Sequence, residues 1–309
     1  MITAFYHPGF AAPIGDHIMP MRKFALVADG LKSFANVALA EPPPATEEDL
    51  LRVHTPDYIN AVRTGIPRKL AESQKFPWSP ELFPSVCLTN GACLAAARQA
   101  LRDGVSAALA SGFHHAHADH GEGFCTFNGL IVAAEALKAA GEVSTVSILD
   151  LDLHYGNGTA ALAPARPWLT ALSIYGSDYQ KNRAYNNVTV RRHTDGPNHF
   201  SATLPAGCDG RRLNEVLEEQ LPSLVKRGKP DLLLYQAGAD PLKEDPYSPL
   251  ALSDADLLER DRRVLEFAHK RRFPIAWVLA GGYARDITKV VEAHLNTFRA
   301  AALVFQNNA

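Results

Sequence analysis

Three ionisable side chains interrupt the otherwise apolar segment STVSILDLDLHYGNGTA, residues 144–160. Asp150, Asp152 and His154 are spaced two residues apart, so along a β-strand they would share one face. Two carboxylates buried on one face would destabilise the fold unless they were paired or bound to a cation. The spacing therefore indicates a cation site on a buried strand.

A further carboxylate follows another apolar segment. LLLYQAGADP, residues 232–241, is apolar up to Gln236 and then presents Asp240 at a glycine-containing turn. Together with Asp152 and His154, this residue would supply three protein ligands and leave a fourth position open, as a catalytic zinc site requires. Ferrous iron accepts the same ligands, so the set allows Zn²⁺ or Fe²⁺.

Histidines are concentrated in SGFHHAHADHGEGFCTFNG, residues 111–129, which holds four of the twelve in the chain. The adjacent pair His114 and His115 is unusual for a loop, although on this segment alone solvent-exposed or capping histidines are the more common interpretation. We expect His117 and His120 to be solvent-exposed or capping residues.

A tyrosine hydroxyl is a further candidate. Tyr283 follows Gly281 and Gly282 in VLAGGYA, where the two glycines would let the backbone turn close to a ligand. Taken alone, a tyrosine after a strand is more often a packing residue.

The elements that would position these residues alternate between strands and helices from about residue 86 onward. Apolar runs predict strands, amphipathic runs closed by glycine predict helices, and the alternation predicts an α/β fold with a mostly parallel sheet covered by helices on both faces. The expected strands are 105–112, 143–153, 169–176, 230–240 and 274–283, and the expected helices are 90–104, 127–141, 211–228, 255–272 and one from about residue 286.

The candidate site residues follow these strands, and ligands of open α/β sheets bind at the carboxyl ends of the strands. We therefore expect a single domain over residues 1–309 with its active site at that edge. Residues 1–85 are less regular, with loops at 41–51 and 75–85. Residues 177–200 form a long polar segment that could be a functional loop or simply solvent-exposed.

Composition narrows the range of partners. The chain has 309 residues, is 47% hydrophobic and carries a net charge of −2, which lacks the basic excess typical of a binder of nucleic acid or membrane surfaces. No secretory signal or long apolar run is present, so we expect a soluble, cytoplasmic protein of undetermined oligomeric state. The cysteines are expected to be buried thiols, since their spacing fits neither a disulfide framework nor a zinc site: Cys87, Cys93, Cys125 and Cys208.

The motifs FHHA, GFC, DLDLHYGNGT, GAD with a following DP, and GGY together resemble the histone deacetylase family of zinc amidohydrolases, which includes the acetylpolyamine amidohydrolases. The resemblance extends from about residue 111 to 285 and implies an arginase/deacetylase-like fold. Phe113 and the segment PMRKFALVADGL, residues 20–31, are more similar to small bacterial, class IV-like members than to class I.

This resemblance implies a role for each candidate. Asp152, His154 and Asp240 match the zinc ligands, His115 the general base, and His114 the neighbour that assists proton transfer. Asp150 matches the carboxylate that orients His114. The implied structural K⁺ or Na⁺ site would be formed by Asp150, Asp152, His154, Ser173 and Ile174.

Further positions bear on the substrate. Tyr283 matches the residue that hydrogen-bonds the substrate carbonyl, and Phe124 matches one wall of the acyl-lysine tunnel, with Gly123, Gly281 and Gly282 beside it. The opposite wall and the rim aspartate of class I members have no clear counterpart. Asn157 stands where many class I members have an aspartate that pairs with the second histidine, so we expect His115 to have a lower pKa.

The implied activity is hydrolysis of an acylated amine, either an acyl-lysine or an acetylpolyamine, with a metal-activated water as the nucleophile. A ureohydrolase of the arginase type would need an Asp-x-His-x-Asp arrangement, and Gly156 stands at the last of those positions. A non-catalytic acyl or metal sensor on the same fold would be expected to have lost the tyrosine or the tandem histidines, and this chain retains them.

Overall fold

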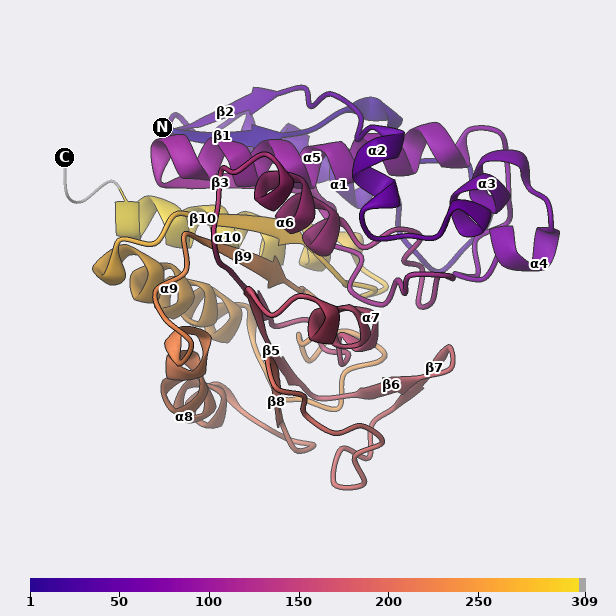
Figure 1. Cartoon of the computed structure of the whole chain (residues 1–309). Helices are drawn as coiled ribbons and strands as arrows, with labels where there is room; N and C mark the ends of the chain where they lie inside the picture. Colours follow the sequence, from indigo (N-terminus) through magenta and orange to yellow (C-terminus); the bar gives the residue numbers. More distant parts are fainter. Residues whose placement is uncertain (306–309) are drawn as a thin grey trace.

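A parallel sheet of eight strands forms the centre of the computed structural model, which describes residues 1–305 (Figure 1). The strand order is β2-β1-β3-β10-β9-β4-β5-β8, and every neighbouring pair runs parallel. The remaining two strands pair as an antiparallel hairpin. The strands are β1 Ile2–Phe5, β2 Val37–Ala40, β3 Val105–Ser111, β4 Val146–Asp150, β5 Leu169–Tyr175, β6 Asp178–Gln180, β7 Arg183–Tyr185, β8 His199–Thr203, β9 Leu232–Ala237 and β10 Ile275–Leu279.

Helices cover both faces of the sheet, as predicted (Figure 1). α5 packs on β3 and β10 and against α6, whereas α9 and α10 pack together and α1 packs against α10. Short 3₁₀ helices span Pro8–Phe10, Ala163–Ala165 and Leu221–Val225. The α-helices are α1 Lys23–Leu31, α2 Glu47–Leu51, α3 Pro56–Thr64, α4 Arg68–Ala71, α5 Leu82–Asp103, α6 Gly129–Ala139, α7 Asn157–Leu162, α8 Gly210–Gln220, α9 Asp254–Arg271 and α10 Ile287–Phe305.

The central strands are fully buried, which explains their continuous apolar sequences. β4, β9 and β10 have no exposed residue, and Trp277 of β10 contacts Phe298 of α10 edge to face at 4.9 Å. Burial on both faces leaves the strand ends as the place where polar side chains can gather.

The strand predicted over residues 143–153 is shorter than expected. β4 ends at Asp150, although the amide of Leu151 still donates to the carbonyl of Gln236 at 3.1 Å. Asp152 and His154 therefore lie just beyond the strand. Their positions are not determined by the alternation of side chains along a strand.

Several element boundaries also differ from the prediction. The loop predicted over 75–85 ends early because α5 already begins at Leu82, with Pro84 tolerated in its first turn. The helix predicted over 211–228 ends at Gln220 and continues as a 3₁₀ helix that contains Pro222. The edge strands β1 and β2, four residues each, lie in the region that the sequence left irregular.

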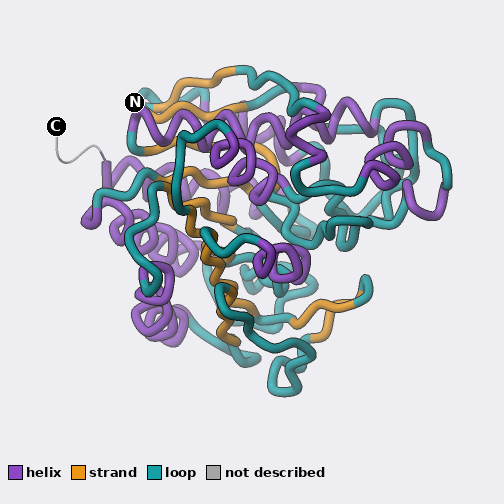
Figure 2. Tube along the Cα trace, in the orientation of Figure 1, coloured by secondary structure: helices purple, strands orange, loops and turns teal. Residues whose placement is uncertain are grey.

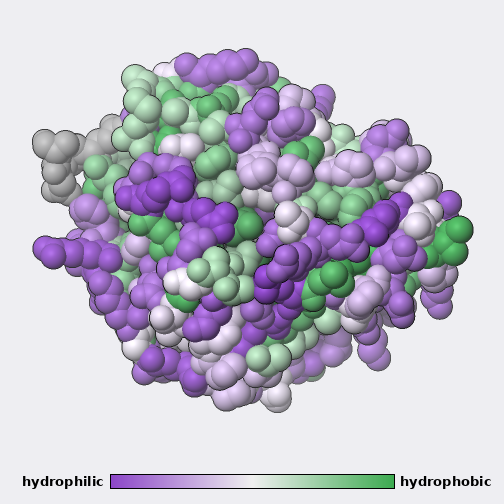
Figure 3. All heavy atoms as spheres, turned by 45° about the horizontal axis from the view of Figure 1, so that its top comes forward, coloured by the Kyte–Doolittle hydropathy of each residue, from purple (hydrophilic) through white to green (hydrophobic). Residues whose placement is uncertain are grey.

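The polar segment 177–200 forms the hairpin of β6 and β7 and a long loop that leads into β8. Figure 2 shows this hairpin projecting among loops, away from the helices that cover the sheet. Hydrophilic and apolar residues are interspersed over the face of the molecule shown in Figure 3. Within residues 1–305, none of the helices is long and apolar enough to cross a membrane.

Candidate active site and metal centre

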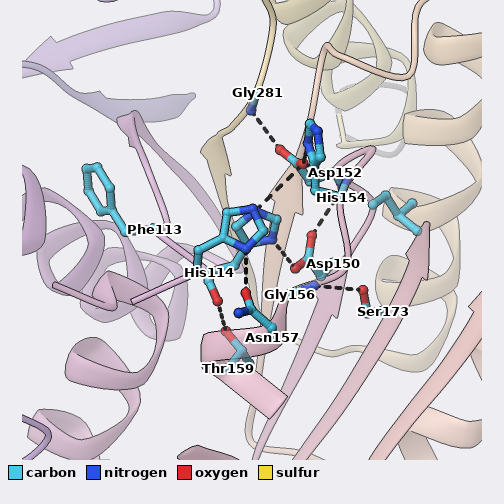
Figure 4. A network of polar contacts seen from close by, with 12 residues as sticks. Phe113, His114, Asp150, Asp152, His154, Gly156, Asn157, Thr159, Ser173 and Gly281 are labelled. Carbon is cyan, nitrogen blue, oxygen red and sulfur yellow. Dashed lines mark hydrogen bonds and ion pairs between the residues drawn. The ribbon is translucent and has the colours of Figure 1, made fainter. Parts of the chain in front are cut away.

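Three ligand atoms converge at the carboxyl ends of β4 and β9. Nδ1 of His154 lies 3.2 Å from Oδ1 of Asp152 and 3.1 Å from Oδ2 of Asp240, and all three side chains are buried. Figure 4 shows Asp152 and His154 side by side, close to Gly281. Ligands about 2.0–2.1 Å from a tetrahedral Zn²⁺ would be separated by about 3.3 Å, so these atoms fit around one divalent ion.

The electrostatics of this cluster also favour a cation. Burial and the charge of Asp152 raise the pKa of Asp240 to about 7. Burial acts to lower the pKa of His154, but hydrogen bonds and charge from Asp152 and Asp240 raise it to about 10. The two carboxylates thus favour positive charge at this position, and a divalent ion bound to the same three atoms would take the place of a proton on His154.

Backbone amides hold the other carboxylate oxygens in place. The amide of Gly281 donates to Oδ2 of Asp152 at 2.8 Å, and the amide of Leu153 donates to Oδ1 of Asp240 at 3.0 Å. A Cβ atom at position 281 would lie 2.0 Å from Oδ2 of Asp240 and 2.8 Å from Oδ2 of Asp152. Only glycine lets the backbone come this close to both carboxylates.

The tandem histidines make two different hydrogen bonds. Nδ1 of His114 lies 2.6 Å from Oδ2 of Asp150, and Nδ1 of His115 lies 2.6 Å from Oδ1 of Asn157. Burial acts to lower the pKa of His114, but the charges of Asp150 and Asp152 raise it overall. Burial and the charges of His114 and His154 hold the pKa of His115 well below its usual range. His115 is therefore neutral, the state that a base requires.

A cavity connects these groups, with about 350 Å³ of empty space when the open solvent at its mouth is included. Tyr283 lines it, and its amide donates to Oδ2 of Asp245 at 2.6 Å. Phe124 also lines the cavity and contacts Tyr283 with ring centroids 6.2 Å apart. The further lining residues are Met19, Ser111, Phe113, His114, His115, Gly123, Cys125, Asp152, His154, Gln236, Ala280 and Gly281.

Comparison with known proteins places this site in a family. The family profile of the histone deacetylase domain matches residues 17–298. The chain belongs to the histone deacetylase family. It is 31% identical to an uncharacterized protein of Picosynechococcus sp., over 97% of this chain and 98% of that protein. It is 28% identical to Histone deacetylase 2 of Arabidopsis thaliana, over 90% of this chain and 71% of that protein.

Solved structures have the same fold. The HDA15 HD domain matches 98% of this chain with a TM-score of 0.79, and this chain covers 93% of it. An acetylpolyamine aminohydrolase from Burkholderia pseudomallei also matches 98% of the chain, with a TM-score of 0.75 and 99% of its own length covered. Both are 19% identical in sequence, so they support the arginase/deacetylase-like fold alone. Placement among class IV-like members of the histone deacetylase family stays a prediction.

A second aromatic wall, for which the sequence offered no counterpart, comes from β6. The ring of Tyr179 stacks on His115 with centroids 3.8 Å apart and meets His154 edge-on at 5.9 Å. Tyr179 and Phe124 line the same opening, together with Ala184 and Tyr247. Tyr179 lies within a polar segment without periodicity, so no local pattern could have identified it.

Two other residues at the site, Lys23 and Glu122, could not be identified from a sequence pattern. Lys23 of α1 is completely buried and donates from Nζ to the carbonyl of Ala280 at 2.5 Å, which fastens the start of the Gly281–Tyr283 turn. Burial lowers its pKa to about 8, although the charges of Asp240 and Asp152 act to raise it. Glu122 is buried and contacts Asn157.

His117 and His120, expected as exposed or capping residues, are half-buried and stack on each other with centroids 4.5 Å apart. Nε2 of His117 lies 3.2 Å from Nδ2 of Asn157, so this pair belongs to the surroundings of the site. The expectation that they are solvent-exposed or capping residues did not include this contact, and both are half-buried.

Three of the residues expected to bind a monovalent cation lie on two adjacent strands, and the other two, Asp152 and His154, follow the end of β4. Asp150 at the end of β4 pairs in register with Ser173 of β5, whose Oγ accepts from the amide of Gly156 at 3.4 Å. Ile174 follows in β5 and is buried. Asp150 also accepts from the amide of Asp152 at 3.1 Å, which ties this region to the metal ligands (Figure 4).

Proposed function

We propose that the protein is a metal-dependent deacylase that hydrolyses the amide bond between an acyl group and an amine. The observation that carries the proposal is that Asp152 and His154 line one cavity with the neutral base His115 and with Tyr283, while Asp240 completes the set of ligand atoms behind them. Membership in the histone deacetylase family supports hydrolysis of a linear amide.

Asp152, His154 and Asp240 would hold a Zn²⁺ or Fe²⁺ ion. When bound, such an ion supplies Lewis-acid polarisation of the substrate carbonyl and makes a water molecule more acidic. Asp150, Asp152 and His154, with Ser173 and Ile174, would form a structural K⁺ or Na⁺ site.

The side chains around the ligands supply the proton transfers. His115 accepts a proton from the attacking water at Nε2, since its Nδ1 is engaged by Asn157. His114, held by Asp150, assists the return of a proton to the leaving amine. Tyr283 donates its hydroxyl to the carbonyl oxygen as negative charge develops there.

We infer that the substrate is an acylated lysine or an acetylated polyamine. The opening between Phe124 and Tyr179 has an aromatic wall on each side, which suits a linear methylene chain. One relative, Acetylpolyamine amidohydrolase 2 of Pseudomonas aeruginosa, is 33% identical over 55% of this chain and 48% of that protein. The name of that relative and the aromatic opening keep both substrate classes in the proposal.

The test pairs metal analysis with a substrate panel. Purified protein should contain about one catalytic divalent ion per chain and should hydrolyse acyl-lysine peptides or acetylpolyamines. Asp240→Asn should lose both the ion and turnover, whereas Asp103→Asn at the end of α5 should keep both. Full metal content and activity in Asp240→Asn, or absence of turnover over the whole panel in metal-loaded wild-type protein, would refute the proposal.

A further inference from the structure

A carboxylate stands behind the amide that contacts the base. Oε2 of Glu122 lies 2.8 Å from Nδ2 of Asn157, while Oδ1 of the same amide lies 2.6 Å from Nδ1 of His115. The three groups form a chain from a buried anion to the imidazole. The resemblance to the family implied that the partner of His115 is the neutral amide of Asn157. The structure adds the carboxylate of Glu122 on the far side of that amide.

The direction of each hydrogen bond in this chain follows from chemistry. An ionised carboxylate only accepts hydrogen bonds, so the Asn157 side chain must turn its NH₂ group toward Glu122. The carbonyl oxygen of the amide then faces His115 and can only accept, so Nδ1 of His115 must carry the hydrogen. Nε2 is left with a free lone pair.

The surroundings of Glu122 keep it ionised. Burial acts to raise its pKa, but hydrogen bonding to His120 and Asn157 holds it below the usual range. His117 presents a second constraint on the amide, because its Nε2 lies 3.2 Å from Nδ2 of Asn157 and accepts the other hydrogen of the NH₂ group. Both neighbours therefore favour the same orientation of the amide.

His117, His120 and Glu122 also lie close enough together to suggest a metal site. The two imidazole rings are stacked, however, with planes only 7° apart. The lone pair of an imidazole nitrogen lies in the plane of its ring, so two stacked rings cannot direct their lone pairs at one ion. This geometry favours a hydrogen-bonding role for the cluster.

We propose that Glu122 is a positioning residue that fixes the Asn157 amide and, through it, the His115 tautomer in which Nε2 is free to accept a proton. The inference rests on the proposed function, in which His115 is the base. Glu122 does not line the cavity, so it acts on the base and not on the substrate. A misplaced tautomer is known to disable a histidine base whose geometry is otherwise intact.

The first test removes the charge and keeps the shape. Glu122→Gln can donate to Asn157 as well as accept from it, so the amide is free to turn and His115 loses its fixed tautomer. We expect kcat to fall about 10–100-fold with KM and metal content unchanged. Asp119→Asn is the matched control, since Asp119 lies on the same loop and pairs with His120; its kcat should stay within about twofold.

The second test separates positioning from a merely structural role. In the double variant Glu122→Gln, Asn157→Asp, a carboxylate faces His115 directly and, in its ionised form, can only accept from Nδ1. Turnover should recover at least tenfold relative to Glu122→Gln alone. A Glu122→Gln variant as active as wild type, or a loss that Asn157→Asp does not rescue in folded, metal-loaded protein, would overturn the proposal.

A spectroscopic readout tests the tautomer without turnover. Long-range ¹H–¹⁵N correlation spectra of the imidazole nitrogens, with His115 assigned from a His115→Asn variant, should show Nδ1 protonated and Nε2 unprotonated in wild type. Glu122→Gln should shift this population. Protonated Nε2 in the wild-type protein would refute the role of Glu122, whereas a correct tautomer in a protein inactive on every substrate would instead refute the proposed function.

Discussion

Nδ1 of His114 lies 2.6 Å from Oδ2 of Asp150, and both side chains are almost completely buried. The adjacent His115 instead contacts the neutral amide of Asn157. The pKa of His114 is raised by the charges of Asp150 and Asp152 against the effect of burial, whereas burial and the charges of His114 and His154 lower the pKa of His115. Different partners assign them different tasks in the proposed proton transfers.

The pair formed by His114 and Asp150 should matter for stability as well as for chemistry. Asp150→Asn would leave His114 without its buried counter-charge, so we expect the free energy of unfolding to fall by about 3–5 kcal/mol. Urea denaturation measures this. Asp29→Asn, which breaks the exposed pair with Lys32, should change the free energy of unfolding little. Equal small effects in both variants would contradict the prediction.

Gly281→Ala should abolish metal binding without unfolding the protein. Its Cβ atom would lie 2.0 Å from Oδ2 of Asp240, so the carboxylate has to move out of the ligand set. Elemental analysis should show an occupancy well below that of wild type. Gly196→Ala is the matched control, because a Cβ atom there meets no atom within 4 Å. Normal occupancy in Gly281→Ala would show that the ion does not bind at Asp240.

Tyr283→Phe removes one hydroxyl and keeps the ring. If that hydroxyl donates to the developing oxyanion, kcat should fall about 10²–10³-fold while metal content is retained. KM should change less, because the hydrogen bond strengthens only as charge develops. Steady-state kinetics on the best substrate of the panel decide the point, and a wild-type rate would remove Tyr283 from the mechanism.

His54 should make the protein sensitive to mild acid. Its side chain is buried, with Nδ1 2.9 Å from the carbonyl of His117 and Nε2 accepting from the amide of Asn128 at 3.0 Å. Burial lowers its pKa from 6.5 to about 4. Between pH 6.5 and 4, His54 therefore binds a proton in the unfolded chain but not in the folded chain. The free energy of unfolding is thus highest above pH 6.5 and decreases as the pH falls toward 4.

The measurement is the free energy of unfolding against pH. His54→Gln should flatten the curve between pH 6.5 and 4 by about 1.4 kcal/mol per pH unit, which corresponds to one proton. His199, whose pKa burial also lowers to about 4, should behave in the same way when replaced. Parallel curves for wild type and His54→Gln would show that His54 titrates alike in both states.

The grouping of Asp152, His154 and Asp240 could be predicted from the sequence because the fold brings distant strand ends together. Asp152 and Asp240 are far apart along the chain, yet parallel strands end at one edge of the sheet. The three predicted ligands do lie together, even though β4 ends at Asp150 and the assumed strand alternation fails beyond it. Their role in binding a metal stays a prediction. The order and direction of the strands determined which side chains lie close together more strongly than the alternation along one strand.

Tyr179, Glu122 and Lys23 could not be found in this way, because each acts through a contact that no local pattern encodes. Lys23 lies 257 positions from Ala280, whose carbonyl it binds. Glu122 lies in the histidine-rich loop 111–129, and its proposed role depends on the orientation of the Asn157 side-chain amide. The position of Tyr179 next to His115 depends on how the hairpin of β6 and β7 packs against the site.

That hairpin is fastened to the rest of the molecule at few points. Oδ1 of Asn182 accepts from the amide of Gly123 at 3.0 Å, and its Nδ2 donates to the carbonyl of Ser73 at 3.3 Å. The ligand set rests on the strand ends of the central sheet, whereas one wall of the opening rests on this exposed segment. In the proposed deacylase, exchange of the exposed Ala184, which lines the opening, would therefore alter selectivity for the amine. Exchange of Tyr179 would alter reactivity as well, because its ring stacks on His115.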